Sequence, residues 1–418
     1  MLNTFKNEYL KLYRESKEQQ WDNYFEGGNH DLGILDNKIY ELVNKYSNKI
    51  EILDRESQVA NLIIIREKVD RNQEVSKLRN YIDDLENYGA DISEEIKKDD
   101  YRYRSVMANK MKKDVLQLMK IRNALAIENG YDSYPDLILE TNGVDYKELN
   151  ILLHNYLEKN LHKAIEIIKK YNIIFENWFD DLDKIDRKNK DYDSNMLIEK
   201  LLNSSGFPRL MEKVEIKYVE DGFSGYATEL EPNNMRMAVE PIKSLDSLRT
   251  LFHELGHVMN YGLNKEEGLF RILPFSLDES MAVIFEYIAS VLLLNGEDKI
   301  RIQELMTLEY TRCAISAIYE FDLWKHPNRA EELFEYHYKK LGVEIKDTSI
   351  WALDSFRSID PVYIHNYVMG ASMAEGLIRY LKISYENDYE SWGKWLYSNI
   401  YYDGWKRDFR EKGLILLQ

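Results

Sequence analysis

The chain has 418 residues, a formal net charge of −17 and one cysteine. This length predicts two lobes, or one large helical domain with a cleft. The acidic charge argues against a nucleic-acid partner, because phosphate backbones are bound by dense Lys and Arg. The lone Cys313 excludes an internal disulfide, which is typical of a reducing compartment.

The sequence predicts no membrane partner. Its first 20 residues lack both the apolar run and the small-residue cleavage site of a signal peptide. The most apolar run, IFEYIASVLLL at 284–294, is shorter than the roughly 20 residues of a spanning helix, and Glu286 interrupts it. We therefore expect a cytoplasmic protein.

Long helices are predicted for the first 200 residues. The segments 58–89, 103–130 and 146–179 contain no proline and repeat apolar residues every three or four positions. Gly89 ends the first segment, and Gly130 is the predicted C-cap of the second. These patterns predict an N-terminal helical lobe over residues 1–205.

A different pattern begins after Ser205. Residues 214–241 combine β-branched and aromatic side chains with glycines and two prolines, which predicts two short strands joined by turns. Helical patterns then return: Ser244 is a predicted N-cap, and apolar residues from Leu248 to Met259 form one stripe. We expect a second domain over 206–418, with loops near Pro327, Gly342 and Pro361.

The segment LFHELGHVMN, at 251–260, places two histidines four positions apart on this predicted helix. Positions i and i+4 share a face, so His253 and His257 can direct their imidazoles at one zinc ion. Glu254 lies where it can reach a metal-activated water as a general base. The alternative is two polar surface histidines, which the strongly apolar helix makes costly.

A third ligand is expected from the next helix, because catalytic zinc sites have three protein ligands and one open position. Glu279 lies near the start of that helix, and Glu286 lies two turns further on the same face. Glu286 is a predicted partner of a histidine, or the fallback ligand. Alternatively, Glu279 forms a capping box with Ser276.

Three residues in IDPVYIHNYVMGASMAEG, at 359–376, are candidates for stabilising an oxyanion: Tyr363, His365 and Tyr367. All three lie together only on an extended segment, whereas on a helix Tyr363 and Tyr367 share a face and His365 points away. Since the chain has 31 tyrosines, aromatic packing is the alternative role.

These motifs resemble the zinc peptidases related to oligoendopeptidase F and thimet oligopeptidase, a branch of the gluzincins. The resemblance spans roughly residues 120–380 and implies Glu279 as the third zinc ligand. Tyr367 is the best match to the oxyanion donor, ahead of Tyr363 and His365, because His365 replaces an aromatic residue of the family. The resemblance to this family rests on four segments: FHELGHVMNYG, DESMAVIFE, YIHNYVMG and IRNALAIENGYDSYPDLIL.

The resemblance implies a mainly α fold. Its expected form is a two-lobed helical ellipsoid with a deep central channel, and a small β-sheet next to the zinc-binding helix. The implied activity is a zinc-dependent metallopeptidase, with one zinc ion, that hydrolyses internal bonds of short unfolded peptides. An edge strand with Gly225 and Tyr226 would pair with the substrate backbone, or form only an ordinary hairpin. Family members are commonly longer, so we expect part of the N-terminal lobe to be missing.

Two other functions stay open. A zinc carboxypeptidase would need a cation for the substrate C-terminus, and Arg357 and Arg379 flank the tyrosine segment. The HPF motif of the helical thermostable carboxypeptidases is absent from the sequence, where KHPN is the nearest match. A non-catalytic helical scaffold or binding protein is the other alternative, against which the intact HELGH motif argues.

Overall fold

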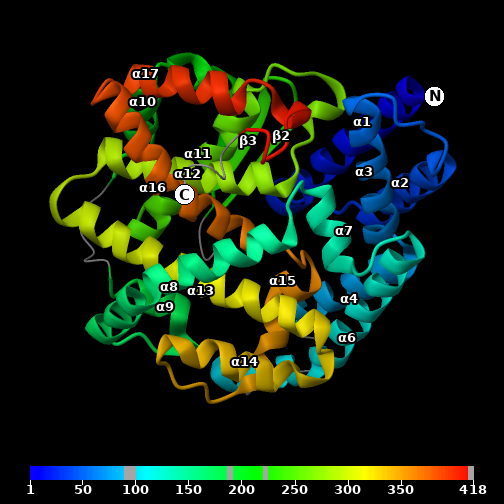
Figure 1. Ribbon diagram of the computed structural model, residues 1–418, viewed down its shortest axis with the longest axis horizontal. Helices are drawn as coiled ribbons and strands as arrows, with labels where there is room; N and C mark the ends of the chain where they lie inside the picture. The colour runs from blue at the N-terminus through cyan, green and yellow to red at the C-terminus, as the bar shows by residue number, and fades with distance from the viewer. Residues whose placement is uncertain (89–99, 186–191, 220–224, 413–418) are drawn as a thin grey trace.

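The N-terminal half of the protein is helical in the computed structural model, which describes residues 1–88, 100–185, 192–219 and 225–412 (Figure 1). Its helices surround a hydrophobic core that continues without interruption into the second half of the chain. They are α1 (Leu2–Trp21), α2 (Leu32–Tyr46), α3 (Arg55–Asp70), α4 (Gln73–Tyr88), α6 (Asp100–Glu128), α7 (Tyr134–Thr141), α8 (Tyr146–Tyr171), α9 (Trp178–Leu182) and α10 (Ser194–Ser204).

The second half contains the sheet and the remaining helices. The strands are β1 (Val214–Tyr218), β2 (Gly225–Glu231) and β3 (Asn234–Val239). The helices are α11 (Leu245–Leu263), α12 (Phe275–Leu293), α13 (Gly296–Lys325), α14 (Ala330–Tyr338), α15 (Ser355–Ser358), α16 (His365–Tyr385) and α17 (Tyr389–Leu396). The predicted mainly α fold with a small β-sheet is confirmed.

Two predicted long helices are interrupted by asparagines. The segment 58–89 divides between α3 and α4, where the Asn72 side chain accepts a hydrogen bond from the Glu74 backbone N–H at 2.9 Å. The segment 146–179 breaks at Asn172, which adopts the left-handed conformation with φ of 51°. Gly130 has φ of 91°, as its predicted C-cap role requires, whereas Gly89 lies outside the described residues.

The sheet has three strands in the order β1-β3-β2, not the two strands predicted. β1 runs parallel to β3, and β2 pairs with β3 antiparallel, with Gly225 opposite Val239. Asn233, with φ of 69°, lies in the tight turn between β2 and β3. β2 is therefore an edge strand, and it packs on α11, the helix that carries the two histidines.

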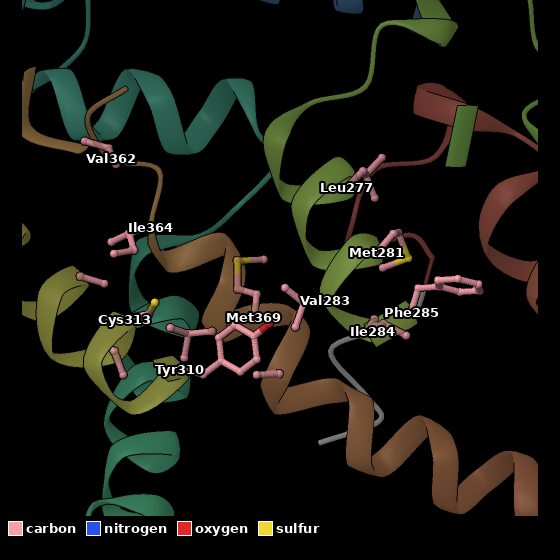
Figure 2. Close-up of a cluster of buried hydrophobic side chains, with 14 of the residues drawn as sticks. Leu277, Met281, Val283, Ile284, Phe285, Tyr310, Cys313, Val362, Ile364 and Met369 are labelled. Atoms are coloured by element: carbon pink, nitrogen blue, oxygen red, sulfur yellow. The ribbon is translucent and has the colours of Figure 1, made fainter. Parts of the chain in front are cut away.

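Helices α11, α12 and α16 form the layer that positions the site, with α12 packed against both others (Figure 1). The apolar side chains of α12 belong to the common core (Figure 2). Figure 2 shows Val283 of α12 gathered with Tyr310 of α13 and Met369 of α16. Among the described residues, no helix is both long and apolar enough to cross a membrane.

Candidate metal centre

Helix α11 presents both histidines on its buried face. The helix begins with a capping box in which Ser244 and Ser247 each bond the other's backbone N–H, as predicted for Ser244. The ring centroids of His253 and His257 lie 4.9 Å apart, and their Nε2 atoms are 3.2 Å apart. One turn of helix therefore brings two imidazole nitrogens to one point.

Glycines in α11 and α16 allow both helices to pack closely against α12. A Cβ at Gly256 of α11 would lie 2.6 Å from the Cα of Ala282, and a Cβ at Gly370 of α16 would lie 2.7 Å from the carbonyl oxygen of Ser280. Both distances are shorter than any ordinary contact, so only glycine permits this approach of the backbones. The consequence is that Glu279 of α12 is fixed between the histidines of α11 and the start of α16.

The donor atoms of His253, His257 and Glu279 converge. Glu279 Oε2 lies 3.2 Å from His253 Nε2, and Glu279 Oε1 lies 3.5 Å from His257 Nε2. All three donor atoms lie within 4.8 Å of one another. Ligands at about 2.0–2.1 Å around a tetrahedral ion lie roughly 3.3–3.4 Å apart, which is close to the distance from each imidazole to its nearer Glu279 oxygen.

Each histidine is oriented by a second carboxylate. His253 Nδ1 donates to Glu286 Oε1 at 2.7 Å, and His257 Nδ1 donates to Asp278 Oδ1 at 2.9 Å. Because a carboxylate engages Nδ1 of each ring, Nε2, which faces Glu279, is the nitrogen through which each histidine would bind a metal ion. The structure thus places Glu286 as a partner of a histidine and outside the group of converging donors.

The surroundings of these donors favour a positive charge. Burial lowers the pKa of His253, but the hydrogen bonds and charges of Glu279 and Glu286 outweigh it and raise the pKa well above its ordinary value. Burial likewise opposes Asp278 and Glu279, which nevertheless raise the pKa of His257 to about 9. Glu279 Oε2 is buried and faces His253 Nε2 at 3.2 Å. A divalent cation fits this donor set.

The capping-box explanation of Glu279 is wrong. Helix α12 begins one residue before Ser276, with Pro274 as its N-cap and no side-chain cap. The Ser276 hydroxyl instead donates to the carbonyl oxygen of Asn142 at 2.5 Å. The carboxylate of Glu279 is therefore free of a capping role and faces the histidines.

The three oxyanion candidates occupy different places. The Tyr363 hydroxyl donates to Glu279 Oε1, whereas Tyr367 makes no hydrogen bond within the described residues and its ring centroid is 5.9 Å from that of His253. His365 is buried beside Phe321 and does not line the cavity at the site. Burial alone lowers the pKa of His365 to about 3, so the ring is neutral. The structure does not bring His365 to the site.

Glu254 lies on the cavity side of α11, against the first residue of β2. A Cβ at Gly225 would be 2.6 Å from Glu254 Oε1, so the missing side chain of Gly225 makes room for this carboxylate. Burial raises the pKa of Glu254, and the nearby His257 and His253 oppose that shift. A carboxylate with a raised pKa is a better proton acceptor near neutral pH than an ordinary glutamate.

A cavity of about 830 Å³ opens over these groups. It is lined from both halves of the chain: by Tyr13 and Lys17 of α1 and by residues of α3 and α4, as well as by His253, His257 and Glu279. Gly225 and Tyr226, at the start of the edge strand, also line it. Its size lies within the roughly 300–1,000 Å³ typical of sites for small ligands.

The two arginines predicted to anchor a substrate C-terminus do not line this cavity. Arg357 is buried and paired with Glu320 at 3.2 Å and with Asp354 at 3.2 Å. Arg379 is exposed on α16. The structure therefore does not bring to the cavity the two arginines that the sequence offered as anchors for a carboxypeptidase.

Sequence reasoning missed three polar residues around the candidate metal centre: Asp278, Tyr261 and Tyr310. Asp278 accepts from Tyr261 at 2.7 Å in addition to His257, and Glu286 accepts from Tyr310 at 2.5 Å in addition to His253. Asp278 directly precedes the predicted ligand Glu279, and that adjacency was the available signal. Tyr310 comes from the distant helix α13, and nothing local in the sequence marks it.

The fold and the converging donors define a helical protein with a cavity over a candidate metal-binding site. No family model matches the sequence, and no curated protein is similar to it. Solved structures share its fold. The M32 carboxypeptidase from Deinococcus radiodurans has a TM-score of 0.68 and 12% identity, over 99% of this chain and 94% of that one.

Two further structures extend this likeness. Metallocarboxypeptidase 1 of Trypanosoma cruzi has a TM-score of 0.68 and 11% identity, over 100% of this chain and 95% of that one. A protein described as an oligoendopeptidase F from Bacillus anthracis has a TM-score of 0.60 and 12% identity, over 96% of this chain and 81% of that one. The chain therefore has the fold that these carboxypeptidases and the oligoendopeptidase F share, which confirms the fold expected from the resemblance to the oligoendopeptidase F branch.

Proposed function

We propose that the protein is a zinc-dependent metallopeptidase that hydrolyses bonds in short unfolded peptides. The observation that carries this proposal is the convergence of His253, His257 and Glu279 beneath a cavity too small for a folded domain. Two nitrogens and one carboxylate oxygen form a donor set typical of catalytic zinc. When bound, such an ion supplies a Lewis acid and lowers the pKa of water.

Glu254 is the proposed general base. Its carboxylate takes a proton from the attacking water and returns it to the nitrogen of the leaving amine. Burial against Gly225 supports this role, because it raises the pKa of the carboxylate and fixes its position. His253 and His257 would hold the ion through Nε2 while Glu286 and Asp278 engage Nδ1, so neither ring would be open to that proton.

Tyr367 is the proposed donor to the oxyanion. The hydroxyl of Tyr363 is occupied by Glu279, and His365 lies away from the cavity. Tyr367 lines the cavity and its hydroxyl is uncommitted in the described chain, so it can donate to the carbonyl oxygen as negative charge develops. The edge of β2, with Gly225 and Tyr226, would pair with the substrate backbone.

Two positions of cleavage fit this site. Internal cleavage is the activity that the sequence motifs imply. Removal of C-terminal residues is the second candidate, and it is favoured by coverage: this chain spans 94–95% of two carboxypeptidases and 81% of the oligoendopeptidase F. The site itself would serve both, because the same ligands and base act on either bond.

The decisive test is the Glu254→Gln variant. We expect it to retain the metal, because glutamine has the same shape, and to lose roughly 10²- to 10⁴-fold in kcat on a quenched fluorescent peptide. Glu267→Gln, which alters an exposed carboxylate outside the cavity, is the matched control and should match the wild type. Wild-type cleavage by Glu254→Gln, or chelator-resistant cleavage by the wild type, would contradict the proposal.

A further inference from the structure

Lys17 is a cationic side chain of the cavity wall with no carboxylate partner among the described residues. Its Nζ lies 5.6 Å from the centroid of the Tyr13 ring, one turn earlier on α1. The cavity arginines, by contrast, are committed: Arg66 to Asp70, Arg71 to Asp36 and Glu67, Arg79 to Asp36, Arg249 to Asp246 and Glu286, Arg312 to Glu309, and Arg122 to the carbonyls of Ser358 and Ile359.

Lys17 lines the same cavity as His253, His257 and Glu279. Tyr13, Tyr226 and, more weakly, Asp278 raise the pKa of Lys17, so it is fully charged at neutral pH. Asp278 is the residue that orients His257, which places Lys17 within electrostatic range of the catalytic groups. Tyr226 belongs to β2, the strand next to Glu254.

A second donor without a partner belongs to the same cavity and lies within electrostatic range of Lys17. The hydroxyl of Tyr226 is buried and has no hydrogen-bond partner within the described parts of the chain. Its ring contacts those of Trp21 and Phe25, which hold it in place at centroid distances of 6.4 and 6.0 Å. A buried polar atom without a partner costs free energy, and a ligand that supplies an acceptor removes this cost.

An ammonium and a phenol on one wall of a cavity are donors without an acceptor, which is the complement of a carboxylate. We propose that Lys17 and Tyr226 bind the C-terminal carboxylate of the peptide and so fix how far from the C-terminus it is cut. This inference rests on the proposed peptidase function. It predicts a released C-terminal fragment of constant length: one residue for a carboxypeptidase, or a fixed larger number for an oligopeptidase.

The test compares peptides with a free C-terminal carboxylate and their C-terminal amides. For the wild type we expect a preference for the free acid of roughly 10- to 150-fold in kcat/KM, as a charged hydrogen bond supplies. In Lys17→Met the preference should disappear through a raised KM for the acid, and Lys17→Arg should restore part of it. Lys11→Met is the matched control, since Lys11 lies on α1 outside this cavity, against α2.

Binding separates failure of this inference from failure of the proposed function. The Glu254→Gln protein, titrated with the acid and the amide, should bind the acid more tightly, and the added Lys17→Met change should remove the difference. No cleavage of any peptide by the wild type would overturn the peptidase. Cleavage with equal rates for acid and amide, or fragments of variable length from the C-terminus, would overturn the carboxylate anchor alone.

Discussion

Gly256→Ala tests whether the close approach of α11 and α12 builds the metal centre. The added methyl carbon would lie 2.6 Å from the Cα of Ala282 and 3.0 Å from its carbonyl oxygen, and both are backbone atoms that no rotamer change can move. Carbon atoms prefer a separation of about 3.5–4.0 Å, so the helices must part by roughly 1 Å. Glu279 lies on the displaced helix, less than one turn from this contact.

The size of the effect follows from the donor distances. Glu279 is 3.2 and 3.5 Å from the two Nε2 atoms, and a further 1 Å takes it beyond the roughly 3.3–3.4 Å at which three ligands share one ion. We expect Gly256→Ala to lose about 100-fold in kcat/KM, as a 1 Å misplacement does, and to lower stability by about 1–3 kcal/mol through overpacking.

The assay is competition with a chromophoric chelator, which reports the metal dissociation constant, alongside peptide cleavage and urea unfolding. Alanine is normally better than glycine inside a helix by roughly 0.5–1 kcal/mol, so a loss of stability cannot come from helix propensity. Gly370→Ala is the companion variant: it parts α12 from α16 and should disturb the Tyr363–Glu279 contact more than the histidines. Wild-type metal affinity and turnover in Gly256→Ala would refute the reasoning.

Two further variants test the roles of Tyr367 in catalysis and of Asp278 in metal binding separately. Tyr367→Phe should keep the metal and lose roughly 10²- to 10³-fold in kcat, because one donor to the oxyanion is removed. Metal titration and peptide cleavage measure the two effects. A fall in bound metal that exceeds the fall in kcat would show that Tyr367 has a structural role instead. Asp278→Asn should weaken metal binding roughly 10- to 100-fold, because the amide no longer fixes the tautomer of His257, and metal titration at constant pH measures this. An unchanged metal affinity in Asp278→Asn would contradict the orienting role.

The local parts of the site were predictable from the sequence because they depend on one helix. The i, i+4 spacing of His253 and His257 and the serine cap at Ser244 are properties of consecutive residues, and helix geometry converts them directly into positions. The resemblance of several separate motifs to one peptidase family predicted the mainly α fold. The predicted domain boundary near residue 205 stays a prediction. One hydrophobic core contains residues from both sides of it, so the core does not mark a boundary there.

The sequence predictions that the structure did not confirm depend on tertiary packing or on hydrogen bonds of single polar side chains. The break between α3 and α4 follows from Asn72, whose side chain bonds the next helix and competes with a continuous one. Ser276 has the right spacing for a capping box, but the carbonyl of Asn142, from another part of the chain, takes its hydroxyl. Arg357 was a plausible anchor by position, and its burial against Glu320 follows only from the packing of α13.

The distribution of charge at the centre gives a reason for the ion that is independent of the motif. Glu279 and Glu286 are buried, and each approaches an imidazole that is itself buried or nearly so. Buried ion pairs seldom stabilise a fold more than apolar side chains of the same volume would, because desolvation offsets their attraction. Stability alone therefore does not explain this cluster. A divalent cation would account for it: the cation would supply the positive charge that these buried carboxylates require, with His253, His257 and Glu279 as its ligands.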